Sequence, residues 1–591
     1  MTAFEIHQPF EPPLIAVTTT DWWVVTLEVK RVQEFLFAIP RLKAMVGANV
    51  LLGETLRGLF NGQGFQPGSV PALAVDHGAS WPASHAEAVV IDPVGASSLD
   101  PNCDVLQWTD GNGKSIPQDD PFKIAQRTGV LIRDASRVQA IFPSREQAAG
   151  FTRAAELLLS DRLPRTRIEI RLEKLGSGDA TSAAEIDSAR VTEGITLFDV
   201  PHAVLCEVSG LEPASTCIRH GERREYLATN VAERFDASAR AGRGESHDII
   251  GLLTDAIGSA LCANGTRDRE FPQEFSQVAP SQYMAVIHAD GNDVGGRLRR
   301  QLESVPSGEN QLARWARSEL MFWQLRRGMR QSVGESLKET FSSTTNQVER
   351  FFPFRLLMIG GDDLLLVCDA PQAMPFVIAL ARSLTLQTAE APGGSLSLGI
   401  GVAIVKSSFP FFRAHQLAEQ LAGSAKRDRG QAADGNMVDW LIASESWVGD
   451  LAHLRAEQYS LARGDERILL SQRPLPVLGE GLSLENLWLA AKGIQSSGVA
   501  RSQLKYLYQC LHLGRHQAEL ALRSMPRTLR AALSSWTPDE APFAATEDGH
   551  IYATSLVDLL ELVELCHLDL SPSSSGPSST LKSLQAVEGA V

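Results

Sequence analysis

The alternation of apolar and polar positions predicts the same succession of elements twice along the chain. An apolar run of strand length is followed by helical periodicity, two short apolar runs separated by a turn, a second helix and a last strand. This is the order of a ferredoxin-like βαββαβ unit. The first copy comprises a strand at 22–29, helices within 32–59 with a break at Pro40, a hairpin at 129–133 and 138–142, a helix at 144–160 and a strand at 166–172.

A second copy of this succession lies further along the chain. It comprises a strand at 283–289, a helix to 302, a long helix at 311–341, a hairpin at 355–359 and 364–368, a helix at 371–387, a strand at 395–405 and a helix at 411–424. Residues 437–442 add an edge strand. The repetition predicts an α+β protein with an internal duplication.

The remaining stretches divide the chain further. A chain of 591 residues is too long for one core. The polar stretch 62–123 contains one predicted strand, 86–91, and the helical pieces of the C-terminal region are 484–492, 502–513 and 517–533. The predicted units are an arm at 1–20, a βαββαβ domain at 21–175, a connecting helical domain at 176–280, a second βαββαβ domain at 281–444, a helical bundle at 445–570 and a disordered tail at 571–591.

Two adjacent carboxylates occupy the turn of the second hairpin. Gly360 and Gly361 supply a tight turn, and Asp362 and Asp363 follow directly. An ordinary solvated turn pair is the plain interpretation. The flanking strands, however, are apolar on both faces and indicate a buried sheet, where two carboxylates repel each other unless a cation lies between them.

A third carboxylate comes from the strand 283–289, which Asp290 follows immediately. If this strand lies beside the hairpin, Asp290, Asp362 and Asp363 converge. Carboxylate oxygens suit Mg²⁺ or Mn²⁺, so the pattern predicts a two-metal phosphoryl-transfer site. Asn292 and Asp293 lie just beyond, and whether either is needed as a ligand stays open at this point.

Composition restricts the setting of such a site. The net charge of −15 argues against global electrostatic attraction to nucleic acid, although arginines gather within 297–330 and 426–429. Most of those arginines can equally be explained as a solvated helix face. The seven scattered cysteines, the lack of a long apolar run and the lack of a signal sequence predict a cytoplasmic protein without disulfides.

The motifs ADGNDVGG and IGGDD, in this order, resemble the palm domain of the Cas10 family (Cmr2 or Csm1), the large subunit of type III CRISPR effectors. That palm is similar to GGDEF-type nucleotide cyclases. Residues 28–52 also resemble the opening of the family's first palm-like domain. The resemblance implies two palms, conversion of ATP to cyclic oligoadenylate with two Mg²⁺ or Mn²⁺ ions, and partners comprising other effector subunits, crRNA and target RNA, with no membrane.

The resemblance also implies roles for individual residues. Asp290 and Asp363 would bridge the two metals, and Asp362 would hold one of them. The expected nucleotide contacts are Gly291, Gly295, Gly360, Gly361 and Lys426. The family loop often reads D-G-D-x-x-G, whereas Asn292 occupies its third position here. The site is weakened if a carboxylate is required there, and little changes if Asp290 and the Gly291 carbonyl suffice.

Three further features bear on the family's chemistry. At the turn of the first hairpin, Asp134 and Arg137 flank Ala135-Ser136, so the first palm is expected to be degenerate and structural. Cys206 and Cys217 are eleven positions apart, whereas many relatives have two close Cys pairs that bind zinc. We therefore prefer to interpret these two cysteines as unrelated thiols. The lone dipeptide His247-Asp248 is interpreted as a helix N-terminal feature rather than a nuclease site.

Two other functions compete with the enzymatic one. The chain could be a scaffold of the same ribonucleoprotein with an idle palm, or a standalone cyclase that makes another ATP-derived signal. An ATP turnover assay with target RNA separates the first, and co-purified guide RNA and subunits separate the second. No segment large enough for polymerase fingers or thumb is evident, which disfavours a template-directed polymerase.

Overall fold

The computed structural model describes most of the chain. It covers residues 22–60, 64–82, 121–134, 136–164, 166–175, 204–210, 212–220, 223–243, 245–246, 248–262, 269–303, 311–342, 350–389, 394–427, 435–443, 450–463, 466–537, 541–546 and 550–568. The predicted arm 1–20, the predicted strand 86–91 and the predicted tail 571–591 fall outside these ranges.

A four-stranded antiparallel sheet, called here the N-terminal sheet, contains the first predicted copy. Val25, Leu27 and Val29 alternate along its central strand and are buried, so one face of the sheet lies on the core. The order of the strands is that of the predicted ferredoxin-like unit. From edge to edge they are β2 (Val130–Asp134), β3 (Arg137–Phe142), β1 (Trp23–Lys30) and β4 (Arg167–Lys174).

The helices of this region follow the predicted periodicity. The expected break at Pro40 separates two of them. Two short helices lie in or beside the polar stretch for which no helix was predicted; one of them is capped by Ser69, whose hydroxyl accepts a hydrogen bond from the Ala72 N–H. The helices are α1 (Val32–Phe37), α2 (Leu42–Leu56), α3 (Val70–Asp76), α5 (Pro121–Thr128) and α6 (Arg145–Arg162).

A six-stranded sheet, the central sheet, contains the second copy. From edge to edge its strands are β14 (Leu475–Pro476), β11 (Met437–Ala443), β10 (Leu398–Lys406), β7 (Tyr283–Gly291), β9 (Asp363–Asp369) and β8 (Phe354–Ile359). The four strands β8-β9-β7-β10 repeat the order of the N-terminal sheet. The prediction that β11 is an edge strand is wrong, because β14 pairs outside it and is too short to leave a sequence pattern.

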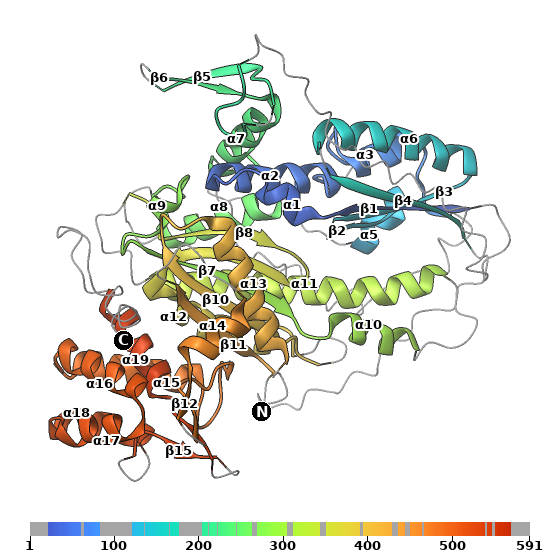
Figure 1. Cartoon of the computed structure of the whole chain (residues 1–591). Helices are drawn as coiled ribbons and strands as arrows, with labels where there is room; N and C mark the ends of the chain where they lie inside the picture. Colours follow the sequence, from blue (N-terminus) through green and yellow to red (C-terminus); the bar gives the residue numbers. More distant parts are fainter. Residues whose placement is uncertain are drawn as a thin grey trace.

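Helices α11 (Gln311–Phe341), α12 (Ala373–Gln387) and α13 (Phe411–Arg427) pack on the central sheet. Helix α10 (Val294–Glu303) follows β7 and lies beside α11 (Figure 1). The first turns of α11 reach the N-terminal sheet, where Leu312 and Trp315 share a buried cluster with Val24 and Ile141. The remainder of α11 packs on the central sheet, so one helix spans both units (Figure 1).

The connecting region is not the purely helical domain that was predicted. It contains the hairpin of β5 (Thr216–His220) and β6 (Arg223–Leu227), followed by α7 (Thr229–Gly242), α8 (Ile249–Cys262) and α9 (Phe275–Val278). The two strands are short and carry charged residues, so they show no apolar alternation. At the start of α8 the Asp248 carboxylate accepts a hydrogen bond from the Ile250 N–H at 3.0 Å, which confirms the helix-terminal interpretation of this residue.

The C-terminal region is likewise not purely helical. Four strands of two to four residues form a small sheet in the order β12-β13-β16-β15, and such short strands carry too little pattern to be predicted. The strands are β12 (Ser460–Arg463), β13 (Glu466–Leu469), β16 (Ile551–Ala553) and β15 (Ala544–Ala545). The helices are α14 (Leu451–Gln458), α15 (Leu484–Ser496), α16 (Arg501–Leu513), α17 (Arg515–Ser524), α18 (Arg527–Leu533) and α19 (Leu556–Leu568).

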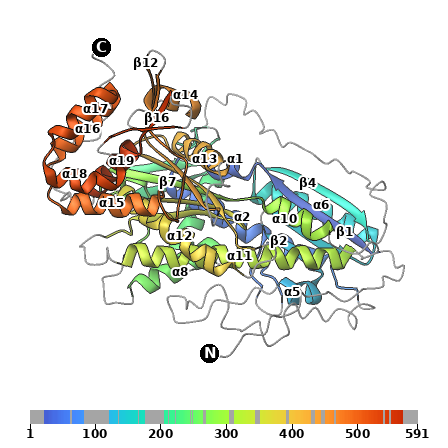
Figure 2. The same cartoon turned by 90° about the horizontal axis from the view of Figure 1, so that it is seen from below.

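Helix α19 and a buried arginine attach this region to the central sheet. Arg473 forms ion pairs with Asp558 of α19 at 2.9 Å and with Glu561 at 3.0 Å, and it donates a hydrogen bond to the carbonyl of Trp440 in β11 at 2.7 Å. In Figures 1 and 2 the N-terminal sheet and the C-terminal helices lie at opposite ends, with the central sheet between them.

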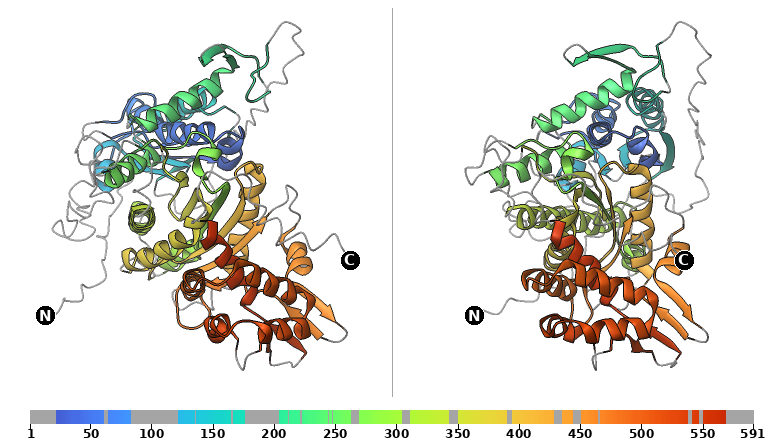
Figure 3. Two further views of the ribbon diagram at one scale, coloured as in Figure 1. Left: turned by 90° about the vertical axis from the view of Figure 1, so that its left-hand side faces the viewer. Right: turned by 60° about the vertical axis from the view of Figure 1, so that its left-hand side comes forward.

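The hairpin β5-β6 stands at the end of the molecule opposite helices α15 to α19 (Figure 3). Its Cys217 is exposed, whereas Cys206 is buried and its sulfur accepts a hydrogen bond from the Ser209 N–H at 3.5 Å. None of the described helices is long and apolar enough to cross a membrane.

Candidate metal and nucleotide site

Strand pairing brings the three predicted carboxylates together. Asp290 is the penultimate residue of β7, and Asp363 is the first residue of β9. The two are direct cross-strand partners in the antiparallel ladder, and Asp362 occupies the adjacent turn. One carboxylate oxygen from each of the three residues lies within 4.8 Å of the others. The predicted convergence is therefore a property of the sheet register.

The backbone of the turn is held in place by β7. The Gly291 N–H donates a hydrogen bond to the Asp362 carbonyl at 3.0 Å, and the Gly360 N–H donates to the Asp363 carbonyl at 2.7 Å. A Cβ atom on Gly291 would lie only 2.6 Å from the Cβ of Asp362, so this position must be glycine if Asp362 is to approach β7. Gly291 thus has a steric role at the site that the sequence did not reveal.

The electrostatics of the cluster favour a bound cation. Burial raises the pKa of Asp362, and the neighbouring Asp290 raises it further. Burial, followed by the charges of Asp362 and Asp290, raises the pKa of Asp363 to about 8. Carboxylates that resist ionisation for these reasons gain stability when a divalent ion neutralises them, and their hard oxygen atoms match Mg²⁺ or Mn²⁺.

Lys426 is the basic side chain that reaches this cluster. It lies in the last turn of α13, and its amino group forms an ion pair with Oδ2 of Asp290. Its charge lowers the pKa of both Asp362 and Asp363, against the larger effect of burial. Lys426 therefore lies beside the carboxylates and is paired with one of them, and its expected contact with the triphosphate stays a prediction.

The close packing of α13 on β10 determines where Lys426 reaches. A Cβ atom on Gly401 would lie 2.0 Å from the Ala418 carbonyl oxygen. A Cβ atom on Gly399 would lie 2.4 Å from Cγ of Lys426. The aliphatic part of Lys426 thus occupies the space that a side chain at position 399 would fill. Gly399 is also the cross-strand partner of Asp290.

The other predicted glycines are less constrained. A Cβ atom on Gly295, at the second position of α10, would meet nothing within 4 Å among the described residues. A Cβ atom on Gly360 would come no closer than 3.5 Å to another atom, and one on Gly361 would lie 3.4 Å from Cγ of Arg326. Gly360 and Gly361 lie next to the carboxylates, and a contact of these glycines with nucleotide stays a prediction.

Asn292 turns away from the carboxylates. Its side-chain amide donates hydrogen bonds to Oγ of Ser397 and to the Gly435 carbonyl, both at 3.1 Å, and only 3% of the residue is exposed. Asp293 forms an ion pair with Arg300 at 3.0 Å. The metal cluster of the described residues contains neither, which favours the reading that Asp290 needs no carboxylate at the third loop position.

Sequence reasoning missed two histidines below the site. His288 lies two residues before Asp290 and faces His415 of α13, with ring centroids 5.4 Å apart. Burial lowers the pKa of both imidazoles, in the case of His415 to about 4. The alternation of positions 288 and 290 on one face of β7 was the available signal.

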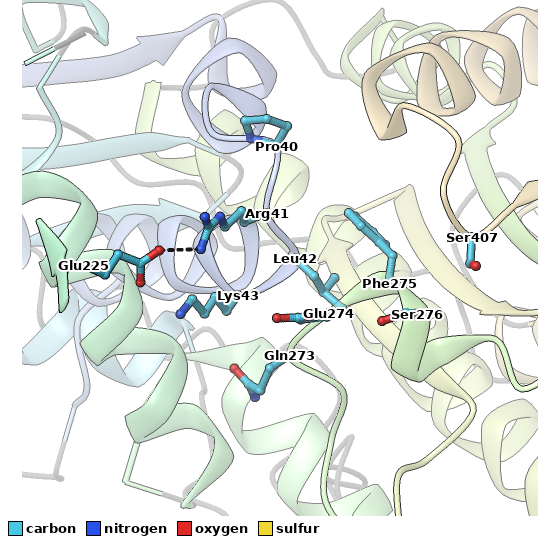
Figure 4. A pocket seen from close by; sticks show the side chains of 10 residues that line it. All are labelled: Pro40, Arg41, Leu42, Lys43, Glu225, Gln273, Glu274, Phe275, Ser276 and Ser407. Carbon is cyan, nitrogen blue, oxygen red and sulfur yellow. Dashed lines mark hydrogen bonds and ion pairs between the residues drawn. The ribbon is translucent and has the colours of Figure 1, made fainter. Parts of the chain in front are cut away.

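A separate pocket lies away from the carboxylates. It has a volume of about 560 Å³ and is lined by the start of α2, by β6, by α9 and by Ser407 (Figure 4). Arg41 and Glu225 form an ion pair across it at 2.8 Å, and Lys43 and Glu274 add one charge of each sign. The opposed charges give the pocket no preference for an anion or a cation.

The comparisons with known proteins identify the unit that carries the site. Residues 283–433 match the family model described as Cas10/Cmr2, second palm domain. Residues 283–433 of this chain are therefore a domain of the Cas10/Cmr2 second-palm type. The matched range contains Asp290, Asp362, Asp363 and Lys426. No curated protein matches the sequence.

The solved structures that this chain resembles include Csm1-Csm4 assemblies. The Csm1-Csm4 cassette in complex with AMPPNP is 11% identical, with a TM-score of 0.35, and the alignment covers 69% of this chain and 53% of that one. The cassette in complex with cA3 is also 11% identical, with a TM-score of 0.43 and coverage of 92% and 70%. The Csm1-Csm4 subcomplex of the type III-A interference complex has 11% identity, a TM-score of 0.36 and the same coverage.

Proposed function

We propose that this chain is a nucleotidyltransferase that joins ATP molecules through 3′–5′ linkages into cyclic oligoadenylate, as the large subunit of a type III CRISPR effector. The observation that carries the proposal is the meeting of Asp290, Asp362 and Asp363 within 4.8 Å inside a Cas10-family palm. The chain spans 53% of the length of the first Csm1 chain that it resembles. The proposed activity therefore rests on the residues of this chain and not on the activity of that protein.

The carboxylates of Asp290, Asp362 and Asp363 would hold two Mg²⁺ or Mn²⁺ ions. When bound, such ions supply the positive charge that acidifies a ribose 3′-hydroxyl and offsets the charge of the departing pyrophosphate. In each addition a bond forms between the 3′-oxygen and the α-phosphorus, the bond from that phosphorus to the β-phosphate oxygen breaks, and the hydroxyl proton passes to solvent.

The remaining residues of the site would orient the nucleotide. Lys426 offers an ammonium group to the triphosphate, and the N–H groups at the start of α10, around Gly295, offer hydrogen bonds to phosphate oxygens. Gly360 and Gly361 leave the turn without side chains beside Asp362, so the triphosphate can approach the backbone.

The match of residues 283–433 to the Cas10/Cmr2 second palm domain supports the proposed setting. The partners would be other subunits of the effector, crRNA and target RNA, in the cytoplasm, and binding of the target RNA would switch synthesis on. The first sheet would serve as a structural palm without metals, since Arg137 stands where the central sheet has Asp363.

The direct experiment isolates the tagged chain with its associated subunits and RNA and incubates it with labelled ATP and Mg²⁺, with and without cognate RNA. The expected products are cyclic oligoadenylates, identified by mass spectrometry, which appear on addition of the RNA. The double variant D362A/D363A is expected to assemble normally and to make none. Unchanged synthesis by that variant would remove the proposed site.

A further inference from the structure

The ion pair between Lys426 and Asp290 occupies one of the two oxygens of a carboxylate that belongs to the proposed metal site. Lys426 bonds to Oδ2 of Asp290, one of the three carboxylates that lie within 4.8 Å of each other. The two side chains are 30% and 35% exposed, so their interaction is only partly screened by solvent. An ammonium group and a divalent ion on the same carboxylate repel each other strongly at such distances.

This contact is built into the fold rather than left to a flexible surface side chain. Lys426 sits at the end of α13, and its aliphatic part crosses β10 where Gly399 provides no side chain. Gly399 pairs directly with Asp290 across the sheet. Because Gly399 has no side chain, the lysine can cross β10 at this position and reach the Asp290 carboxylate.

We propose that Lys426 is an internal counter-ion that divalent metal must displace from Asp290, and that displacement frees its ammonium group to bind the triphosphate. The second half of this proposal rests on the proposed function, whereas the first half rests on the contact alone. Without nucleotide, the lysine lowers the affinity for metal. With nucleotide, the lysine gains a new partner, so metal and triphosphate assist each other's binding.

A variant without the positive charge of Lys426 should bind divalent metal more tightly. Lys426→Met retains the aliphatic part that lies over Gly399 but removes the ammonium group. The metal then meets Asp290 without a competing bond and without a neighbouring positive charge. Metal binding to Lys426→Met does not have to break a charge-assisted hydrogen bond, so we expect its affinity for metal to be about tenfold higher than that of the unmodified chain.

The test measures Mn²⁺ binding by electron paramagnetic resonance, at one pH above 8, with the full chain and in the absence of nucleotide. Lys426→Met is expected to bind Mn²⁺ about tenfold more tightly than the unmodified chain. Lys406→Met, at the opposite end of β10, is the matched control and is expected to bind as the unmodified chain does. Circular dichroism and melting temperatures check that both variants are folded.

A second variant guards against a folding effect of the first. Gly399→Ala leaves every charge in place, but the new methyl group would lie 2.4 Å from Cγ of Lys426 and so moves the lysine off Asp290. It is also expected to tighten Mn²⁺ binding. Addition of a non-hydrolysable ATP analogue should increase the Mn²⁺ affinity of the unmodified chain by a larger factor than that of Lys426→Met.

The outcomes separate this inference from the proposed function. Unchanged or weaker Mn²⁺ binding by Lys426→Met overturns the inference. Equal binding by the unmodified chain and D362A/D363A overturns it too, because the carboxylates are then no metal site. Tighter binding by Lys426→Met in a chain that makes no product from ATP supports the counter-ion and removes the proposed reaction instead.

Discussion

Four strands of the central sheet repeat the strand order of the N-terminal sheet, but the two sheets carry different residues at the cross-strand pair beside the hairpin turn. In the central sheet the first residue of β9, Asp363, faces Asp290 of β7. At the matching place in the N-terminal sheet the first residue of β3, Arg137, faces Glu28 of β1. A pair of like charges needs an external cation, whereas a pair of opposite charges is already neutral. The same backbone arrangement therefore leaves uncompensated negative charge in the central sheet, where a cation can bind, and a neutral pair in the N-terminal sheet.

The strands on the other side of each pair differ in a corresponding way. In the N-terminal sheet, Glu28 faces Glu169 of β4, and Lys30 pairs with both carboxylates, at 2.5 and 3.4 Å. In the central sheet, Asp290 faces Gly399, and the compensating lysine, Lys426, arrives from a helix instead. The counter-ion of the N-terminal pair comes from the same strand as Glu28, whereas that of the central pair comes from a separate helix.

Converting the central pair into the N-terminal one should have the largest effect. Asp363→Arg would place a guanidinium group beside Asp290, as Arg137 lies beside Glu28. We expect loss of Mn²⁺ binding and a reduction in oligoadenylate synthesis of about a thousandfold or more, because both the ligand and the negative charge are removed. Measurable synthesis near the original rate would show that the cross-strand pair is not what distinguishes the two sheets.

The close approach of α13 to β10 gives the second prediction. Gly401→Ala would bring a methyl group within 2.0 Å of the Ala418 carbonyl, so the helix must move. We expect destabilisation of about 2–4 kcal/mol, measured as a lowered melting temperature. Gly423→Ala, on the same helix with nothing within 4 Å, is the control and should leave the melting temperature equal or slightly raised.

Burial of His415 predicts a dependence of stability on pH. The imidazole packs against His288, Phe37 and Phe411, and burial lowers its pKa from 6.5 to about 4. Between these values the unfolded chain binds a proton that the folded chain does not, so stability falls as the pH drops through this window. At pH 5 the loss is about 2 kcal/mol. His415→Phe should lose less melting temperature than the unmodified chain between pH 7 and pH 5, and an identical loss would contradict this role.

The smallest effect is expected at the N-terminal pair itself. Arg137→Ala removes the charge opposite Glu28, but this pair lies at an exposed strand end. Exposed ion pairs contribute about 1 kcal/mol or less, so the melting temperature should change little. Synthesis of oligoadenylate should be unchanged. A marked loss of synthesis would mean that the N-terminal sheet takes part in catalysis.

The sequence predicted those parts of the molecule where the apolar pattern is long and regular. The 31-residue helix α11 has the predicted bounds, and both hairpins and the strands beside them were found. The convergence of Asp290 with Asp362 and Asp363 was predicted on the condition that the strand 283–289 lies beside the hairpin, and the pairing of β7 with β9 meets that condition.

The features that escaped prediction depend on short or tertiary interactions. Strands of two to five residues, such as β5 and β14, do not establish a period. The pairing of Lys426 with Asp290 depends on the register of β10 against β7 and on how closely α13 packs on Gly399. The hydrogen bonds from Asn292 to Ser397 and Gly435 join residues that are more than 100 positions apart, and no local sequence pattern reveals such contacts.

The most direct test of the central claim is a crystal of this chain grown with Mn²⁺ and a non-hydrolysable ATP analogue, examined by anomalous scattering at the manganese edge. The account predicts two manganese peaks bound by Asp290, Asp362 and Asp363, with the Lys426 amino group moved from Asp290 to the triphosphate. A well-ordered site with bound nucleotide but no manganese peak at these carboxylates would contradict it.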